Sequence, residues 1–281
     1  MHLDIFASHK EECMTTTVLQ DLSPLKTIPF VANPRPRERP RVLVVVPTRN
    51  TARTLEETIR RIPAGVADDI LVVDNGSTDL SADIAESMGL PVVRHYFNRG
   101  YGASQKTAFS YATAIGAEVL ALLHSDMQYP PHLLPDLVAP ILEGKADVVF
   151  GSRMMDGKAI AGGMPKYKYV GNRILTRLEN KVLGSELSEF HTGCRAYRVK
   201  MLERIPYFFN SNNWLFDSQI IFQIINLKFR IAEFPIPCIY DGNSSSVPFW
   251  DGMVYGVGVF GLSARYLLHR SGLWPDAKYR S

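Results

Sequence analysis

The chain has few cysteines, little net charge and no long apolar run, and each scarcity excludes a class of protein. Its three cysteines, Cys13, Cys194 and Cys238, stand far apart among 281 residues, so they predict neither a disulfide framework nor a metal-binding cysteine cluster, and a reducing compartment fits. The formal net charge of +3 argues against a bulk nucleic-acid binder. No stretch of about 18 uncharged apolar residues occurs, so no transmembrane helix is expected.

Residues 1–40 are expected to form a flexible arm and not a domain. Met1–Thr17 lacks the basic and then apolar order of a signal peptide. Asn33–Arg41 contains three prolines and four arginines, which oppose regular structure and favour solvent. A plain linker is one interpretation, and a basic contact with anionic lipid headgroups is the other.

From Arg41 onward, short apolar segments alternate with segments of helical spacing. Strands that are apolar on both faces and alternate with helices indicate a parallel sheet covered on both sides. The α/β class is therefore predicted. The expected strands are 42–46, 70–73, 92–94, 119–123 and 147–150, and the expected helices are 54–62, one capped by Asp79 or Ser81 that runs to 88, 103–115 and one after Pro131.

Polar side chains follow the fourth expected strand, in the sequence Leu-Leu-His-Ser-Asp-Met-Gln-Tyr-Pro-Pro over residues 122–131. Open α/β folds bind ligands at the carboxyl edge of the sheet, where this strand would deliver these groups. Asp126 and Gln128 are two residues apart, so in an extended segment they would point the same way. Their oxygens suit Mg²⁺ or Mn²⁺. The alternative is an ordinary polar turn.

Two common nucleotide-binding motifs are missing. Pro47-Thr48-Arg49-Asn50 follows the first strand where a dinucleotide-binding fold would carry Gly-x-Gly-x-x-Gly, and no phosphate-binding Gly-x-x-x-x-Gly-Lys-[Ser/Thr] loop occurs.

Four motifs in order resemble those of family 2 glycosyltransferases, in the branch of dolichol-phosphate mannose synthase and bacterial polyprenyl-phosphate sugar transferases. They are Val-Val-Val-Pro-Thr-Arg-Asn at 44–50, Val-Val-Asp-Asn-Gly-Ser-Thr-Asp at 72–79, Asn-x-Gly-x-Gly at 98–102 and Ser-Asp-Met-Gln-Tyr-Pro-Pro at 125–131. The resemblance implies a single Rossmann-like α/β domain of GT-A type over 41–247, with a mostly parallel sheet flanked by helices. A nucleotide-sugar donor, Mg²⁺ or Mn²⁺ and inversion at the anomeric carbon are also implied.

The resemblance places the donor's base near the first two strand ends. Asp74 can accept hydrogen bonds from a base or from ribose hydroxyls, although it suits UDP and GDP equally. Pro47 and Thr48 would lie under the base. Asn50 would either join them or cap the first helix, and Asp74 is otherwise a turn residue.

Further donor contacts are expected along the third helix and the fourth strand end. Gly100 and Gly102 would let the backbone approach the ligand, and Lys106 would reach a phosphate or remain solvated. His124 stands where the related enzymes carry the first aspartate of Asp-x-Asp-x-Gln. It is either a ribose or metal contact or a core histidine.

The second half of the chain is expected to carry the acceptor chemistry. Arg153 directly follows the fifth strand, where its guanidinium could bind phosphate bidentately. The segment with Thr192, Gly193 and Arg195 resembles the one that lines the donor pyrophosphate or the acceptor. His191 is a candidate third metal ligand or phosphate contact.

Asp217 precedes an apolar helical run, 220–227. It is a candidate general base for an acceptor hydroxyl, or an N-cap. A lipid phosphate is already ionised and needs no base, in which case Asp217 would only position groups.

Residues 248–281 are expected to form a helical tail. Phe249–Leu268 is apolar but is interrupted by Asp251, Arg265 and four glycines, so it suits a membrane interface, a core helix or a dimer interface better than a span. The loop Asp241–Ser246 could close over a bound phosphate.

Together these features predict a metal-dependent inverting glycosyltransferase that moves a sugar from a UDP- or GDP-sugar to a polyprenyl phosphate. A hydroxyl or glycan acceptor and a non-catalytic nucleotide-sugar binding module are the alternatives. A cytoplasmic location with peripheral contact at the membrane is expected, and the oligomeric state is left open.

Overall fold

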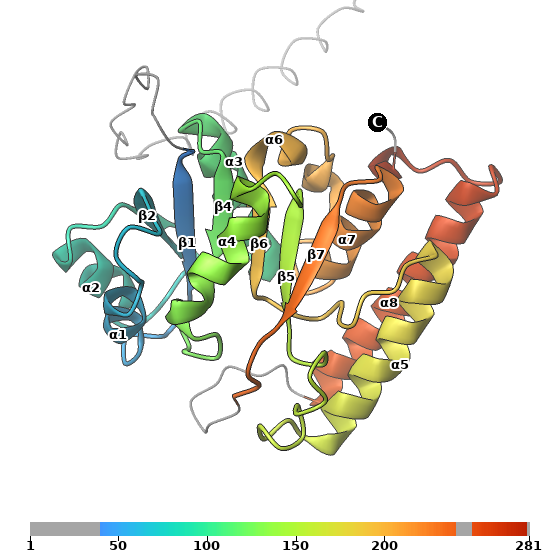
Figure 1. Cartoon of the computed structure of the whole chain (residues 1–281), viewed down its shortest axis with the longest axis horizontal. Helices are drawn as coiled ribbons and strands as arrows, with labels where there is room; N and C mark the ends of the chain where they lie inside the picture. Colours follow the sequence, from blue (N-terminus) through green and yellow to red (C-terminus); the bar gives the residue numbers. More distant parts are fainter. Residues whose placement is uncertain (1–39, 240–248, 280–281) are drawn as a thin grey trace, which may run out of the picture. The chain divides into compact units, whose positions relative to one another are not determined.

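The computed structural model describes residues 40–239 and 249–279, and its centre is one seven-stranded sheet (Figure 1). The strand order is β3-β2-β1-β4-β6-β5-β7. Their bounds are β1 Val42–Thr48, β2 Asp69–Asp74, β3 Val92–Arg94, β4 Val119–Leu122, β5 Val148–Ser152, β6 Arg195–Arg198 and β7 Ile231–Pro235.

All strands but one run the same way. β1 pairs in parallel with β2 and β4, and β5 pairs in parallel with β7, whereas β6 is antiparallel to both β4 and β5. The carboxyl ends of β2, β1, β4 and β5 therefore meet the amino end of β6 at one edge of the sheet. Loops at this edge are the ones that the sequence motifs occupy.

Helices cover both faces of the sheet. They are α1 Leu55–Arg60, α2 Ser81–Ser87, α3 Tyr101–Ala114, α4 Leu134–Leu142, α5 Lys166–Leu183, α6 Val199–Leu202, α7 Phe216–Asn226 and α8 Phe249–Arg270. Leu43 and Val45 pack with α3 and α7 on one face, and Val42, Val44 and Val46 pack with α1 and α4 on the other. This alternation explains why the strands are apolar throughout.

The predicted α/β fold with a mostly parallel sheet is confirmed, and β1 to β5 lie within two residues of the expected strands. The predicted helices also form, although α1 begins at Leu55 after Thr54. Helix α5, which lies beside α8 (Figure 1), was not expected, nor was the antiparallel strand β6.

Two expectations fall outside the described residues, the arm 1–39 and the loop 241–246. The division into arm, domain and tail stays a prediction. In the part of the chain that the structure describes, no helix combines the length and apolar character that crossing a bilayer requires.

Candidate functional site

Hydrogen bonds hold the turn after β4 against β1 and α1. The Ser125 hydroxyl donates to the carbonyl of Pro47 at 3.2 Å and accepts from the Thr51 hydroxyl at 2.9 Å. The Ser125 carbonyl accepts from the Thr54 hydroxyl at 2.6 Å. Two of the four motifs are thereby fixed to each other.

The segment that carries Asp126 and Gln128 is a tight turn and not an extended strand. Met127 has a φ of 62°, in the left-handed region, and Asp126 Oδ1 accepts from the backbone N–H of Gln128 at 3.1 Å. The extended geometry in which Asp126 and Gln128 would point the same way is therefore not the one the structure has. A non-glycine residue in this conformation is held by its surroundings, and such residues gather at functional sites.

The turn carries oxygen atoms that suit a hard cation, but the oxygens of a bound phosphate would have to complete the coordination. Both Asp126 and Gln128 are buried. Across residues 40–239 and 249–279, no group of three or more His, Cys, Asp or Glu side chains is placed to hold a metal. One carboxylate and one carboxamide suit Mg²⁺ or Mn²⁺ when phosphate oxygens complete the coordination.

Asp74, at the end of β2, is buried and only half satisfied. Its Oδ2 accepts from the backbone N–H of Ser77 at 3.2 Å, but Oδ1 has no partner among the described residues. Buried polar atoms are rarely left unpaired, because an unmade hydrogen bond costs about 1–3 kcal/mol. Asn75 next to it holds the 98–100 loop, since its carboxamide bonds to Asn98, Gly100 and the N–H of Arg99.

The residues around the expected base site have mixed roles. Thr48 is buried and its hydroxyl donates to the carbonyl of Val46 at 3.2 Å, while Pro47 is half-buried. One interpretation was that Asn50 caps α1, but the N-cap of this helix is Thr54. Asn50 has a φ of 53°, and its Oδ1 accepts from the N–H of Thr78 at 2.8 Å, which joins the loops after β1 and β2.

Gly102 and Lys106 face another part of the protein and not an open ligand site. A Cβ atom on Gly102 would lie 2.4 Å from the carbonyl oxygen of Ser211, and one on Gly100 would lie 2.2 Å from that of Asn212. Lys106 Nζ donates to the carbonyl of Asn210 at 2.5 Å and to Asn212 Oδ1 at 2.8 Å. The ammonium group of Lys106 thus anchors residues 208–212, and its expected phosphate contact stays a prediction.

Arg153 stands at the end of β5 as expected, but its guanidinium pairs with a buried carboxylate. Its Nε donates to Glu189 Oε1 at 3.0 Å, its Nη2 donates to the same oxygen, and Nη2 also donates to the carbonyl of His191 at 2.7 Å. The pKa of Glu189 is lowered by Arg153 in spite of burial, which acts the other way. The Arg153 guanidinium, which was expected to bind phosphate bidentately, therefore donates to Glu189 in this structure.

Arg195, at the start of β6, is fully buried and also paired inside the protein. Its Nε donates to the carbonyl of Thr192 at 2.7 Å, and Nη1 lies 3.1 Å from Asp217 Oδ1. The expectation that Arg195 lines the donor pyrophosphate or the acceptor stays a prediction. Burial raises the pKa of Asp217 to about 6, although Arg195 opposes this. Asp217 lies in the first turn of α7 without acting as its N-cap, which is Leu215.

His124 is enclosed by aromatic rings. The ring of Tyr129 meets it edge-on with centroids 5.3 Å apart, and the ring of Tyr101 lies 6.0 Å away. A Cβ on Gly193 would lie 2.5 Å from His124 Nε2, and that nitrogen is buried without a partner among the described residues. Burial lowers the pKa of His124, so the ring is a neutral imidazole. Tyr101 also stacks on Trp214, with centroids 4.5 Å apart.

His191 lies in a different cluster from Asp126 and Gln128. Its Nδ1 lies 2.8 Å from the hydroxyl of Tyr255, and its Nε2 lies 3.3 Å from Glu179 Oε2. Both ring nitrogens thus face protein groups, and the role of His191 as a third metal ligand or phosphate contact stays a prediction. No local sequence signal marks Tyr255 or Glu179, because their partners are far away in the chain.

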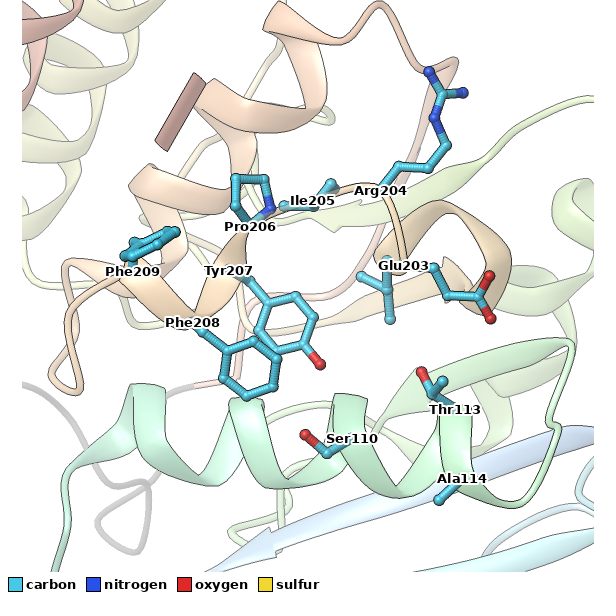
Figure 2. Close-up of a pocket in the computed structure, with 11 residues that line it drawn as sticks. Ser110, Thr113, Ala114, Glu203, Arg204, Ile205, Pro206, Tyr207, Phe208 and Phe209 are labelled. Atoms are coloured by element: carbon cyan, nitrogen blue, oxygen red, sulfur yellow. The ribbon is translucent and has the colours of Figure 1, made fainter. Parts of the chain in front are cut away.

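A separate hollow of about 860 Å³ lies beside the second half of α3 (Figure 2). Residues 202–209 form its other wall, including Tyr207 and Phe208. It contains none of the predicted site residues. Most of them lie instead at the opposite edge, where the strands end.

Comparison with known proteins agrees with this arrangement. Residues 43–206 match the sequence profile of glycosyl transferase family 2. The chain belongs to this family. It is therefore a glycosyltransferase, and the matched region contains all four motifs.

Several curated proteins are similar to this chain over most of their length. The chain is 29% identical over 205 residues to an uncharacterized protein of Methanocaldococcus jannaschii, with 73% of this chain and 84% of that protein covered. It is 29% identical to the polyprenol monophosphomannose synthase of Mycolicibacterium smegmatis, covering 73% and 79%. It is 30% identical to a dolichyl-phosphate hexose transferase of Haloferax volcanii, covering 72% and 83%.

Solved structures share the GT-A fold of this glycosyltransferase. Glucosyl-3-phosphoglycerate synthase from Mycobacterium tuberculosis, crystallised with Mn²⁺, UDP and phosphoglyceric acid, superposes with a TM-score of 0.62. The match covers 85% of this chain and 80% of that one at 19% identity, and so it supports the fold alone.

Proposed function

We propose that this glycosyltransferase moves a sugar, with inversion, from a UDP- or GDP-sugar to a polyprenyl phosphate in the presence of Mg²⁺ or Mn²⁺. The relatives named as polyprenol and dolichyl-phosphate sugar transferases support the acceptor class. The unpartnered Oδ1 of Asp74, at the same sheet edge as the Asp126–Gln128 turn, is the observation that carries the donor site.

The nucleoside would lie at the carboxyl ends of β1 and β2. Asp74 Oδ1 would accept from an N–H of the base or a ribose hydroxyl, and either bond would satisfy it. Uracil and guanine both offer such donors, so both donor classes fit. The Ser125 bonds fix the Asp126–Gln128 turn to β1, the strand that pairs with β2.

Asp126 and Gln128 would hold the divalent cation, which when bound neutralises the charge that develops on the departing diphosphate. In the transfer, a phosphate oxygen of the acceptor forms a bond to the anomeric carbon. The bond from that carbon to the donor's diphosphate oxygen breaks, and its electron pair leaves with the nucleoside diphosphate. An ionised phosphate requires no proton removal, so Asp217 can remain paired with Arg195.

A lipid acceptor requires the enzyme to reach a lipid surface. The exposed apolar face of α8 could make this contact. Trp250, Val254 and Val257 follow helical spacing and are 76%, 72% and 70% exposed. The neighbouring α5 exposes Tyr167, Val170 and Ile174 and carries five basic residues, Lys166, Lys168, Arg173, Arg177 and Lys181. Apolar side chains beside basic ones suit an anionic membrane interface.

The decisive experiment compares acceptors with one donor set. UDP- and GDP-sugars are offered with Mn²⁺ to the protein and a short polyprenyl phosphate, or to the matched polyprenol. Transfer to the phosphate alone is expected, because only that acceptor is ionised at neutral pH. Transfer to polyprenol, or to neither acceptor, would contradict the phosphate assignment.

The metal assignment is tested separately. Asp126→Ala is expected to abolish Mn²⁺-dependent binding of the preferred nucleoside diphosphate in calorimetry, because only one hard ligand would remain. Asp136→Ala, at an α4 aspartate outside the site, is the control. Unchanged Mn²⁺-dependent affinity in the Asp126 variant would contradict the assignment.

A further inference from the structure

A short chain of polar groups lies beneath α8. The hydroxyl of Tyr255 on this helix is 2.8 Å from His191 Nδ1 and 2.8 Å from the hydroxyl of Ser218 on α7. Nε2 of His191 lies 3.3 Å from a carboxylate oxygen of Glu179 on α5. The Glu179 side chain has no exposed surface. Three helices and the 190–195 segment therefore meet through four polar side chains.

The two groups that Tyr255 joins belong to the two segments beside the site. His191 begins a segment whose carbonyls receive Arg153 Nη2 and Arg195 Nε, at 2.7 Å each. Two residues further on, the N–H of Gly193 donates to the Tyr129 hydroxyl at 2.9 Å, and a Cβ atom on Gly193 would lie 2.5 Å from His124 Nε2. Movement of His191 would thus displace residues of the turn after β4.

Ser218 ties Tyr255 to the other segment. It follows Asp217, whose carboxylate lies 3.1 Å from Arg195. Gly258, one turn after Tyr255, allows close approach to α7, because a Cβ there would lie 3.3 Å from a methyl group of Leu215. The start of α7 is therefore held by α8 at two adjacent points.

Helix α8 has two different faces at this level. Val254 and Val257 are exposed, whereas Tyr255 is half-buried and Val259 is fully buried. The Tyr255 hydroxyl is thus the polar contact of the inner face that reaches the 190–195 segment. The exposed face is the one assigned above to the lipid interface.

We propose that Tyr255 is a positioning residue, which fixes the His191–Arg195 segment and the start of α7 relative to each other. The relative position of these two segments then depends on the position of α8. Tyr255 acts through His191 and Ser218 and touches neither donor nor acceptor. The kinetic part of its test rests on the proposed function, whereas the spectroscopic part requires no substrate.

The test compares Tyr255→Phe with Tyr266→Phe. Tyr266 lies on the same inner face of α8, and its hydroxyl donates to Asn226 Oδ1 at 3.3 Å, at the other end of α7. Both variants remove one hydroxyl and keep the ring, so their losses of Tm should be similar. In ¹⁵N–¹H spectra without substrate, the His191 ring signals are expected to shift in Tyr255→Phe and to stay in place in Tyr266→Phe.

With the acceptor that the wild type uses, Tyr255→Phe is expected to lower kcat by about tenfold while the donor KM changes less than about twofold, since misplacement costs rate more than affinity. Ser218→Ala should produce part of this loss. Unshifted His191 signals, or equal losses of kcat in Tyr255→Phe and Tyr266→Phe, would overturn the proposal. Failure of polyprenyl phosphate as acceptor would leave the spectral comparison intact.

Discussion

Arg153 and Glu189 form a buried ion pair that further hydrogen bonds support. Asn172 Nδ2 and the backbone N–H of Arg153 also donate to the carboxylate, so Glu189 accepts from several directions. Removing one partner of a buried pair leaves the other charged and desolvated, which costs more than the pair itself contributes. The same reasoning applies to Arg195 and Asp217.

Arg153→Ala is expected to lower the free energy of unfolding by about 3–5 kcal/mol, because Glu189 would be left as an uncompensated charge. The double variant Arg153→Met, Glu189→Gln removes both charges and should regain most of this loss. Urea denaturation of the three proteins measures both steps. A double variant less stable than Arg153→Ala would show that the ion pair itself stabilises the fold.

Asp74→Ala is expected to weaken binding of the preferred nucleoside by roughly 1.5–3 kcal/mol, the range for a hydrogen bond to a charged group. Titration calorimetry with nucleosides that lack phosphate isolates this contact from the metal. Asp83→Ala, which removes an exposed aspartate paired with Arg94, is the matched control. Equal affinity in wild type and Asp74→Ala would make Asp74 a turn residue only.

Residue type and motif position predicted where the charged side chains stand, but not what they contact. Asp74 ends β2 and Arg153 follows β5 as expected. Glu189, the partner of Arg153, lies 36 positions away, and the partners of Lys106 lie more than 100 positions away. A local pattern contains no information about such distant partners, so an arginine that binds phosphate and one that pairs with a buried glutamate look alike in the sequence.

At the scale of elements, hydrophobic pattern predicted the buried parts of the fold well. β1 and β4 are continuous apolar runs because both faces are covered. β6 was missed because it is four residues long and begins and ends with arginine. α5 was missed because its composition is polar on average and three of its buried positions, Asn172, Thr176 and Glu179, are polar, so a search for buried apolar residues does not select it.

The exposed face of α8 supplies the prediction at this scale. Val254→Glu with Val257→Glu is expected to abolish cosedimentation with vesicles of anionic phospholipid, because each charge must leave water to enter the interface. Leu142→Glu places one such charge at an exposed leucine on α4 and should retain binding. Equal vesicle binding by all three proteins would exclude α8 as the docking face.

At the scale of the whole molecule, buried ionisable groups make stability depend on pH. Burial raises the pKa of Glu179 to about 8, against the smaller opposing influence of Ser218 and Arg195. Burial lowers the pKa of His191 to about 4, so this ring is neutral at physiological pH. The fold therefore prefers a protonated Glu179 beside a neutral His191 imidazole. Ionisation of Glu179 or protonation of His191 lowers the stability of the folded protein.

The sign follows from proton linkage. Because the folded pKa of Glu179 lies above its ordinary value of 4.5, the folded protein binds the proton more tightly than the unfolded chain. Its stabilising contribution is complete below pH 4.5 and is lost as the pH rises to about 8, by on the order of 4 kcal/mol.

Glu179→Gln keeps the shape and removes this titration, so its free energy of unfolding is expected to fall less than that of the wild type between pH 5 and pH 8. Urea denaturation at several pH values measures the difference, and His132→Gln, at a residue outside the cluster, is the control. Parallel curves for wild type and Glu179→Gln would mean that the Glu179 carboxyl ionises in the fold as it does in water, and that the polar chain beneath α8 carries a negative charge.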